Sequence, residues 1–136
     1  MPDHRMSFHH VELWVADFAS ARPRWAWLLG ELGWRVLAEW DRGTSWGSPQ
    51  SGYLVVEQSP DVRDASHDRI APGMNHVALR IDDRVDLDAL VAASPGRGWR
   101  LLFPQSHPYA GGPQRCAAYL EGDDGFEVEI VVQDQG

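Results

Sequence analysis

Two histidines and a small set of glutamates in this sequence have the residue types and the spacing that a divalent-metal site requires. His10 and His76 stand in two similar stretches, FHHVELWVADF and MNHVALRIDDR, and Glu57 ends a third stretch, GYLVVE. Glu127 and Glu129 follow the turn residues DDG near the C-terminus. Imidazole and carboxylate groups are ligands of Zn²⁺, Ni²⁺, Co²⁺, Fe²⁺ and Mn²⁺. Because Glu127 and Glu129 are two residues apart, periodicity places both on one strand face and does not choose between them.

The two histidine stretches form an internal repeat. Each has a histidine followed by valine, a leucine two residues after the valine, and an aspartate four residues after the leucine (His10, Val11, Leu13 and Asp17; His76, Val77, Leu79 and Asp83). Apolar and polar residues alternate, which predicts a strand whose histidine lies on the face opposite to the valine and leucine. Each half of the chain is therefore expected to present one histidine on the polar face of its first strand.

The elements that must position these residues follow the same order in both halves. Helical spacing predicts helices over 18–32 and 84–94, and Pro23 places the regular start of the first near Ala21. Alternating or apolar runs bounded by turn residues predict strands over 8–16, 34–40, 44–47, 51–57, 74–81, 99–103, 115–120 and 126–132. The polar stretch 58–73 contains proline and glycine and is expected to link the halves. Each half then reads strand, helix, strand, strand, strand.

Composition narrows the class of protein. Hydrophobic residues make up 43% of the 136 residues, which is enough for one domain or for two small halves that share a core. The net charge of -8 argues against nucleic acid or an anionic membrane as a partner. The sequence has no lysine, which excludes a Schiff-base mechanism, and Cys116 alone excludes an internal disulfide. Because no apolar run has the length of a signal peptide or a membrane span, we expect a cytoplasmic protein.

The order and spacing of HHVELWVADF, GYLVVEQ, GMNHVALRIDD and DDGFEVEIV resemble the vicinal oxygen chelate superfamily. That superfamily includes glyoxalase I, methylmalonyl-CoA epimerase, fosfomycin- and bleomycin-resistance proteins and extradiol dioxygenases. The resemblance covers residues 8–132, with Asp123 where the family's C-terminal motif commonly has proline. It implies an α+β fold within a single domain, 1–136. In this fold two βαβββ modules, 8–57 and 74–132, form an open, mostly antiparallel, barrel-like sheet with the helices outside.

The same resemblance implies a ligand set and a type of chemistry. It selects His10, Glu57, His76 and Glu129 as ligands of one divalent metal (Zn, Ni, Co, Fe or Mn), as in the glyoxalase and epimerase group. In that group the metal binds two neighbouring oxygens of a small-molecule substrate and stabilises an enolate or oxyanion, which is lyase or isomerase chemistry. By analogy, Glu129 or Glu57 removes a proton α to a carbonyl. The resemblance also leads us to expect a homodimer.

Two other activities fit the same motifs. An extradiol Fe²⁺ dioxygenase uses two histidines and one glutamate, and here His107 and Tyr109, in SHPYAGG, would be further catalytic residues. A metal-free drug-binding protein of the bleomycin-resistance type holds a flat ligand between aromatic side chains. The residues expected to line a substrate pocket are Trp14, Tyr53, Arg80, Trp46 and Trp99.

Overall fold

The computed structural model describes residues 8–47 and 52–133, and the chain divides into two compact units, Met1–Ser66 and His67–Gly136. We call them unit 1 and unit 2 and describe each by itself. The boundary between them falls inside the stretch 58–73 that the sequence marks as a linker. No helix in the described part of the chain is long and apolar enough to cross a membrane.

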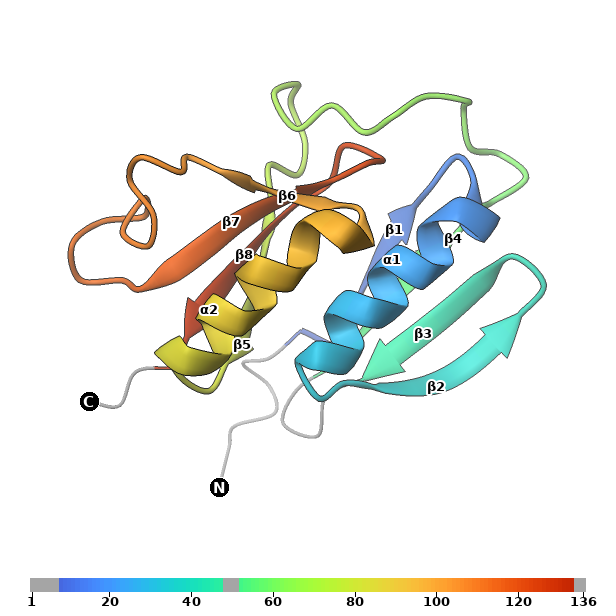
Figure 1. Cartoon of the computed structure of the whole chain (residues 1–136). Coiled ribbons are helices and arrows are strands. Elements are labelled where there is room, and N and C mark those ends of the chain that lie inside the picture. Colours follow the sequence, from blue (N-terminus) through green and yellow to red (C-terminus); the bar gives the residue numbers. More distant parts are fainter. Residues whose placement is uncertain (1–7, 48–51, 134–136) are drawn as a thin grey trace. The chain divides into compact units, whose positions relative to one another are not determined.

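Unit 1 has the element order βαβββ (Figure 1). Its elements are β1 (His10–Trp14), α1 (Phe18–Glu31), β2 (Arg35–Trp40), β3 (Gly43–Gly47) and β4 (Tyr53–Glu57). The strands form one open sheet in the order β1-β4-β3-β2, in which β1 and β4 are parallel and the other two pairs are antiparallel. This arrangement places the histidine strand beside the strand that ends in Glu57.

Unit 2 repeats this topology. Its elements are β5 (Val77–Ile81), α2 (Arg84–Ala93), the short 3-10 helix η2 (Ser94–Arg97), β6 (Trp99–Leu102), β7 (Ala117–Gly122) and β8 (Glu127–Val132). The sheet order is β5-β8-β7-β6, again with one parallel pair and two antiparallel pairs. The predicted α+β fold of two βαβββ modules is therefore confirmed.

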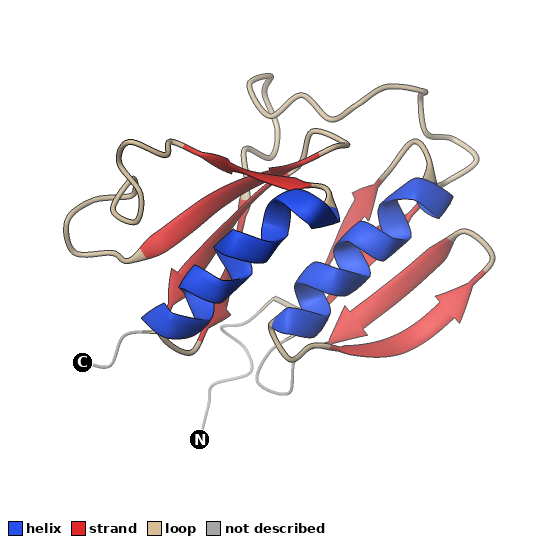
Figure 2. Ribbon diagram, viewed as in Figure 1, coloured by secondary structure: helices blue, strands red, loops and turns tan. Residues whose placement is uncertain are grey.

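In each unit a helix lies on one face of the sheet and leaves the other face open (Figure 2). In unit 1 the apolar side chains of Leu13, Leu54 and Val56 pack toward α1, whose Trp25 and Leu28 are fully buried. In unit 2 Leu79, Val128 and Ile130 pack in the same way toward Leu87 and Leu90 of α2. Because strand side chains alternate, the intervening residues of the same strands project from the open face. The predicted histidines and glutamates are among these.

The repeated aspartates cap the two helices. Asp17 accepts a hydrogen bond from the backbone N–H of Ser20 at 3.2 Å, and Asp83 accepts one from the N–H of Asp86 at 2.9 Å. An N-cap carboxylate satisfies a backbone donor that the first helical turn leaves unpaired. The first helix consequently begins at Phe18, and the prediction of a regular start near Ala21 is wrong: Pro23 lies inside α1. Burial of one face of α1 offsets the backbone hydrogen bond that proline cannot make.

Candidate metal centre

The open face of unit 2 brings His76 and Glu129 together. His76 lies just before β5, and its Nε2 is 3.2 Å from Oε1 of Glu129 in β8. Parallel pairing of the two strands sets Ala78 opposite Glu129, so the imidazole and the carboxylate project from the same face. The other ring nitrogen of His76 is 2.7 Å from the side-chain oxygen of Asn75. Such a hydrogen bond fixes the orientation of a ligating imidazole.

The carboxylate of Glu129 is buried and only partly neutralised. Glu129 is 2% exposed, and within the described residues its Oε2 has no hydrogen-bond partner. The nearest cationic group is Arg115, whose Nη1 is 3.5 Å from Oε2 and whose side chain is 56% exposed. A buried carboxylate without full pairing is costly, and a bound cation removes that cost. The donor set of one imidazole and one buried carboxylate therefore fits a divalent metal.

Tyr119 lies beside this pair on β7. It is the cross-strand partner of Glu129, and its ring meets that of His76 edge to face at a centroid distance of 5.6 Å. Burial raises the pKa of the Tyr119 phenol, and the nearby carboxylate of Glu129 raises it further. The phenol therefore keeps its proton at neutral pH, and its hydrogen bond to the carboxylate of Glu129 is one cause of the raised pKa.

Glu127 shares this face but has a different partner. It is also 2% exposed, and its Oε1 is 3.2 Å from Nη1 of Arg69. The Nε of Arg69 donates a hydrogen bond to Glu121 at 2.9 Å, and Arg100 forms a further ion pair with Glu121. Arg69 thus lies within ion-pair distance of Glu127, although Oε1 of Glu127, like Oε2 of Glu129, has no hydrogen-bond partner among the described residues. Of the two glutamates that periodicity leaves open, Glu129 is the one that contacts a histidine.

The open face of unit 1 carries His10 but does not bring Glu57 to it. The ring of His10 stacks on Tyr53 at a centroid distance of 4.8 Å, and Tyr53 is also its partner in the strand pairing. Glu57 is paired with Trp14 at the other end of the same strands, and its Oε2 accepts a hydrogen bond from Nε1 of Trp40 at 3.1 Å. Four residues of strand separate the two levels, or about 13 Å.

The residue of unit 1 that occupies the position equivalent to Glu129 is Val55. In unit 2 the residue two positions after the histidine, Ala78, pairs with Glu129. In unit 1 the residue two positions after the histidine, Glu12, pairs with Val55. Val55 is 7% exposed and has no ligating atom. The repeat therefore provides a histidine in each unit, but a carboxylate at this position only in unit 2.

Within residues 8–47 and 52–133, the structure contains no group of three or more His, Cys, Asp or Glu side chains that could hold a metal. Within unit 2, the predicted ligands His76 and Glu129 lie in contact, and within unit 1 the strand register separates His10 from Glu57.

The predicted pocket residues separate into two groups. Trp14 is 44% exposed on the open face of unit 1, next to Glu12, which accepts a hydrogen bond from its indole at 2.6 Å. Arg80 is exposed on the open face of unit 2. Trp46 and Trp99 need correction, because they are 2% and 1% exposed. Strand alternation turns both indoles toward the helix-covered cores, so neither lines an open pocket.

The two residues suggested for a dioxygenase lie in the loop between β6 and β7. His107 has Arg84 and Asp88 of α2 as its charged neighbours, which places its imidazole on the helix side of the sheet. Burial and the charge of Arg84 lower its pKa, while Asp88 acts in the opposite direction. Tyr109 is 48% exposed. Within unit 2 the structure therefore does not bring His107 to the pair formed by His76 and Glu129.

Two residues of this face did not emerge from the sequence motifs. Tyr119 and Arg115 both contact Glu129, but neither belongs to the repeated stretches. Alternation along 115–120 does place Arg115, Ala117 and Tyr119 on one face, and this was the signal that could have found them. The pairing of β7 with β8 decides that this is the face that also carries Glu129.

Comparison with known proteins places this arrangement in context. A family model described as the Glyoxalase/Bleomycin resistance protein/Dioxygenase superfamily matches residues 9–119. The uncharacterized protein YqjT of Bacillus subtilis (strain 168) is 31% identical over 123 residues, which cover 90% of this chain and 96% of YqjT.

Solved structures agree. A glyoxalase candidate from Bacillus halodurans is 36% identical, with a TM-score of 0.85 over 94% of this chain and 96% of that one. A glyoxalase/bleomycin resistance protein from Albidiferax ferrireducens T118 has a TM-score of 0.73 at 21% identity, over 93% of this chain and 98% of the other. The second similarity concerns the fold alone.

Proposed function

Because this chain belongs to the glyoxalase/bleomycin resistance protein/dioxygenase superfamily, we propose that it is a divalent-metal-dependent enzyme of the glyoxalase type. It acts on a small oxygenated carbonyl compound by lyase or isomerase chemistry. The observation that carries the proposal is the buried carboxylate of Glu129, which contacts His76 and has an oxygen without a hydrogen-bond partner among the described residues.

His76 and Glu129 are the proposed metal ligands of unit 2. His10 is the proposed ligand of unit 1, because it holds the same position in the repeat as His76. Glu57 is left out of this set because the strand register separates it from His10. A bound divalent ion supplies Lewis-acid polarisation of neighbouring substrate oxygens. Imidazole and carboxylate ligands are compatible with Zn²⁺, Ni²⁺, Co²⁺, Fe²⁺ and Mn²⁺ alike, so the ligand types define this group of ions and not one member of it.

The chain's own side chains have separate tasks in this proposal. Glu129 is the carboxylate assigned to take a proton α to the substrate carbonyl, because it contacts His76, whereas Glu127 lies within ion-pair distance of Arg69. Tyr119 keeps its proton, since its pKa is raised by burial and by Glu129, and its hydroxyl holds the carboxylate of Glu129 in place through a hydrogen bond. Asn75 holds the imidazole of His76 in orientation.

The test is divalent-metal affinity, measured by calorimetry on the chelator-treated full chain. His76→Ala and Glu129→Gln should each lower the affinity by about 100-fold or more, as loss of a direct ligand does. Glu127→Gln is the matched control, because Glu127 is equally buried on the same strand but is paired with Arg69. Equal losses in Glu127→Gln and Glu129→Gln would contradict the assignment.

His10 is tested in the same assay against its neighbour. His10→Ala should weaken metal binding, whereas His9→Ala should leave it close to wild type. His9 contacts His10 through their Nδ1 atoms at 2.9 Å, so the control also reports any indirect effect through that contact. If the two variants behave alike, His10 is not a ligand.

One observation favours a second candidate, a binding protein for flat ligands. Trp14 and Trp40 are 44% and 41% exposed on the sheet of unit 1, and each indole donates a hydrogen bond to a carboxylate, Glu12 or Glu57. Exposed indoles beside carboxylates suit a flat cationic aromatic compound. Proflavine binding, followed by tryptophan fluorescence in metal-free protein and in Trp14→Leu, tests this candidate. Saturable binding that Trp14→Leu abolishes supports it, and its absence argues against it.

A further inference from the structure

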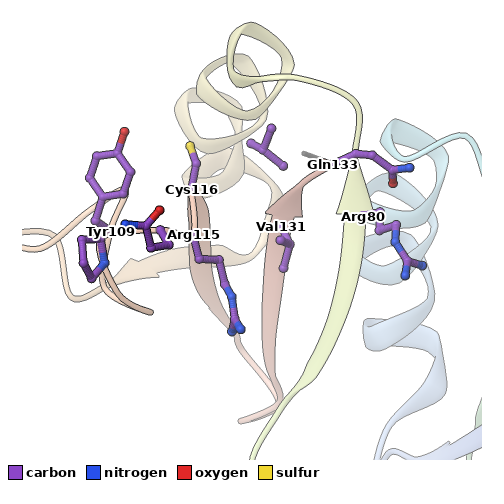
Figure 3. Close-up of a pocket in the computed structure, with 9 residues that line it drawn as sticks. Arg80, Tyr109, Arg115, Cys116, Val131 and Gln133 are labelled. Carbon is purple, nitrogen blue, oxygen red and sulfur yellow. The ribbon is translucent and has the colours of Figure 1, made fainter. Parts of the chain in front are cut away.

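Unit 2 has a pocket of about 630 Å³ near the end of β8 (Figure 3). Two arginines, Arg80 and Arg115, are among its lining residues. The complete set is Arg80, Tyr109, Pro113, Gln114, Arg115, Cys116, Val131, Val132 and Gln133. Acidic side chains are absent from this lining.

The strand register explains why the two arginines flank one hollow. Arg80 of β5 and Ala117 of β7 both pair with Val131 of β8, so the three share one level of the open face. Arg115, two residues before Ala117, projects from the same face. Figure 3 shows Arg80 and Arg115 on opposite sides of Val131.

These two arginines differ from three other arginines of unit 2 in their partners. Arg69, Arg84 and Arg100 form ion pairs with Glu121 and Glu127, with Asp88, and with Glu121, respectively. Arg80 has no ion pair with any residue that the structure describes, and the contact of Arg115 with Glu129 is long, at 3.5 Å. The pocket therefore carries two incompletely neutralised positive charges in a chain whose net charge is -8. A local positive site of this kind attracts anions.

We propose that this pocket binds an anionic oxygen group of the substrate, a carboxylate or a phosphonate, between Arg80 and Arg115. Guanidinium groups recognise both anions through paired N–H donors. The pocket has the volume of sites that hold small ligands. The inference rests on the proposed function in naming the substrate class; none of the pocket residues is a proposed metal ligand, although Arg115 contacts Glu129.

The distance to the reacting group follows from the sheet. Val131 is two residues beyond Glu129 on the same face of β8, a separation of about 7 Å. A substrate whose anionic group lies at Arg80 and Arg115 thus reaches Glu129 with a carbon skeleton a few atoms long. The proposed substrate class is accordingly a small carbonyl compound that bears a carboxylate or phosphonate at one end.

The test uses methylphosphonate and acetate as probes on the chelator-treated full chain, at constant ionic strength. Binding is measured by calorimetry for wild type, Arg80→Gln, Arg115→Gln and the control Arg97→Gln, which makes the same charge change in η2. We expect at least one probe to bind saturably, and each pocket variant to bind it about 10-fold more weakly. Arg97→Gln should stay within about 2-fold of wild type. The probe that binds with the higher affinity shows whether the pocket prefers a phosphonate or a carboxylate.

Cys116 provides a second readout that does not depend on enzyme activity. It is the only cysteine of the chain and lines the pocket. Alkylation by iodoacetamide should slow when the preferred probe is present, and the protection should disappear in Arg80→Gln.

Outcomes for the pocket and for the metal site are separable. Unchanged probe affinity in either pocket variant, or no saturable binding of either probe, overturns the inference. Metal affinity is measured on the same proteins in a separate titration. Probe binding without metal affinity contradicts the proposed function alone, and metal affinity without probe binding contradicts this inference alone.

Discussion

At the scale of single residues, the environment of two chemically identical groups decides their roles. Glu127 and Glu129 are both 2% exposed on one face of β8. Arg69 lies within ion-pair distance of Glu127, whereas Glu129 meets His76 and an exposed arginine. Burial without a close cation makes Glu129 the stronger candidate ligand. Glu57 also has a partner of its own, because its carboxylate accepts a hydrogen bond from the indole of Trp40 and does not lie beside His10.

Glu57→Gln should therefore leave metal affinity within about 2-fold of wild type, because a ligand-to-metal bond is not lost. The hydrogen bond from Trp40 survives in glutamine, whose side-chain oxygen also accepts. Elemental mass spectrometry on protein purified without chelator, alongside Glu129→Gln, checks this. A large loss of bound metal in Glu57→Gln would show that Glu57 is a metal ligand after all.

His107 predicts a pH effect on stability. Burial, with Arg84 adding to it, lowers the pKa of His107 from its usual 6.5, and its Nδ1 is buried without a hydrogen-bond partner among the described residues. Below pH 6.5 the unfolded chain then binds more protons at this site than the folded chain, so acidification favours unfolding. His107→Gln should lose less stability than wild type between pH 7.5 and pH 5.5, measured by urea unfolding. A larger loss in the variant would show the opposite sign of the shift.

At the scale of elements, the turn before β8 depends on backbone geometry that only glycine supplies. Gly125 has φ +89, and a Cβ at this position would lie 2.2 Å from the carbonyl oxygen of His67. His67 in turn stacks on Phe126 at 4.4 Å and contacts the Met74 carbonyl oxygen through its ring. His67, which lies in the stretch expected to link the halves, is thus packed against this turn. Its packing holds the entrance of β8 and so the position of Glu129.

A series of glycine substitutions separates the two contributions at this turn. Gly96→Ala, with open space and no positive φ, should change the free energy of unfolding by less than about 0.5 kcal/mol. Gly33→Ala, with φ +84 but no near atom, should cost about 1 kcal/mol. Gly125→Ala has both the strained φ and the clash, and should cost about 3 kcal/mol. Urea unfolding measures all three, and an equal cost at Gly33 and Gly125 would mean that the clash relaxes freely.

At the scale of the whole molecule, ligand binding and stability are linked. A metal that binds only the folded chain stabilises it by about 2.7 kcal/mol at a free concentration of 100 times its Kd. For a chain of this length that raises the Tm by on the order of 10 °C. Wild type should show this shift on adding the tightest-binding ion and lose it with chelator. Glu129→Gln should show little response; a full response there would place the binding site elsewhere.

The homodimer stays a prediction at this scale. It came from the family resemblance, and the structure describes one chain. Sedimentation velocity on wild type tests it directly: a single species of twice the mass of 15.3 kDa is expected. A concentration-independent monomer would contradict it.

The sequence by itself determined the elements and the faces of the strands. The repeat around His10 and His76, the capping aspartates and the alternation of apolar residues are local patterns, and local patterns specify helices, strands and their buried sides. His76 and Glu129 could be named on this basis together with the family resemblance. The helix start at Phe18 was misjudged because burial of α1 outweighs the local effect of Pro23.

Only the tertiary structure decided which side chains meet. A strand keeps its faces when its partner slides by two or four residues, so periodicity could not tell whether Glu57 or Val55 lies beside the residue two positions after His10. Pairing of β1 with β4 selects Val55. Long-range ion pairs likewise tie Arg69 to Glu121 and Glu127, and strand pairing leaves Arg80 and Arg115 on one pocket. Such contacts join residues far apart in the chain, and no local pattern encodes them.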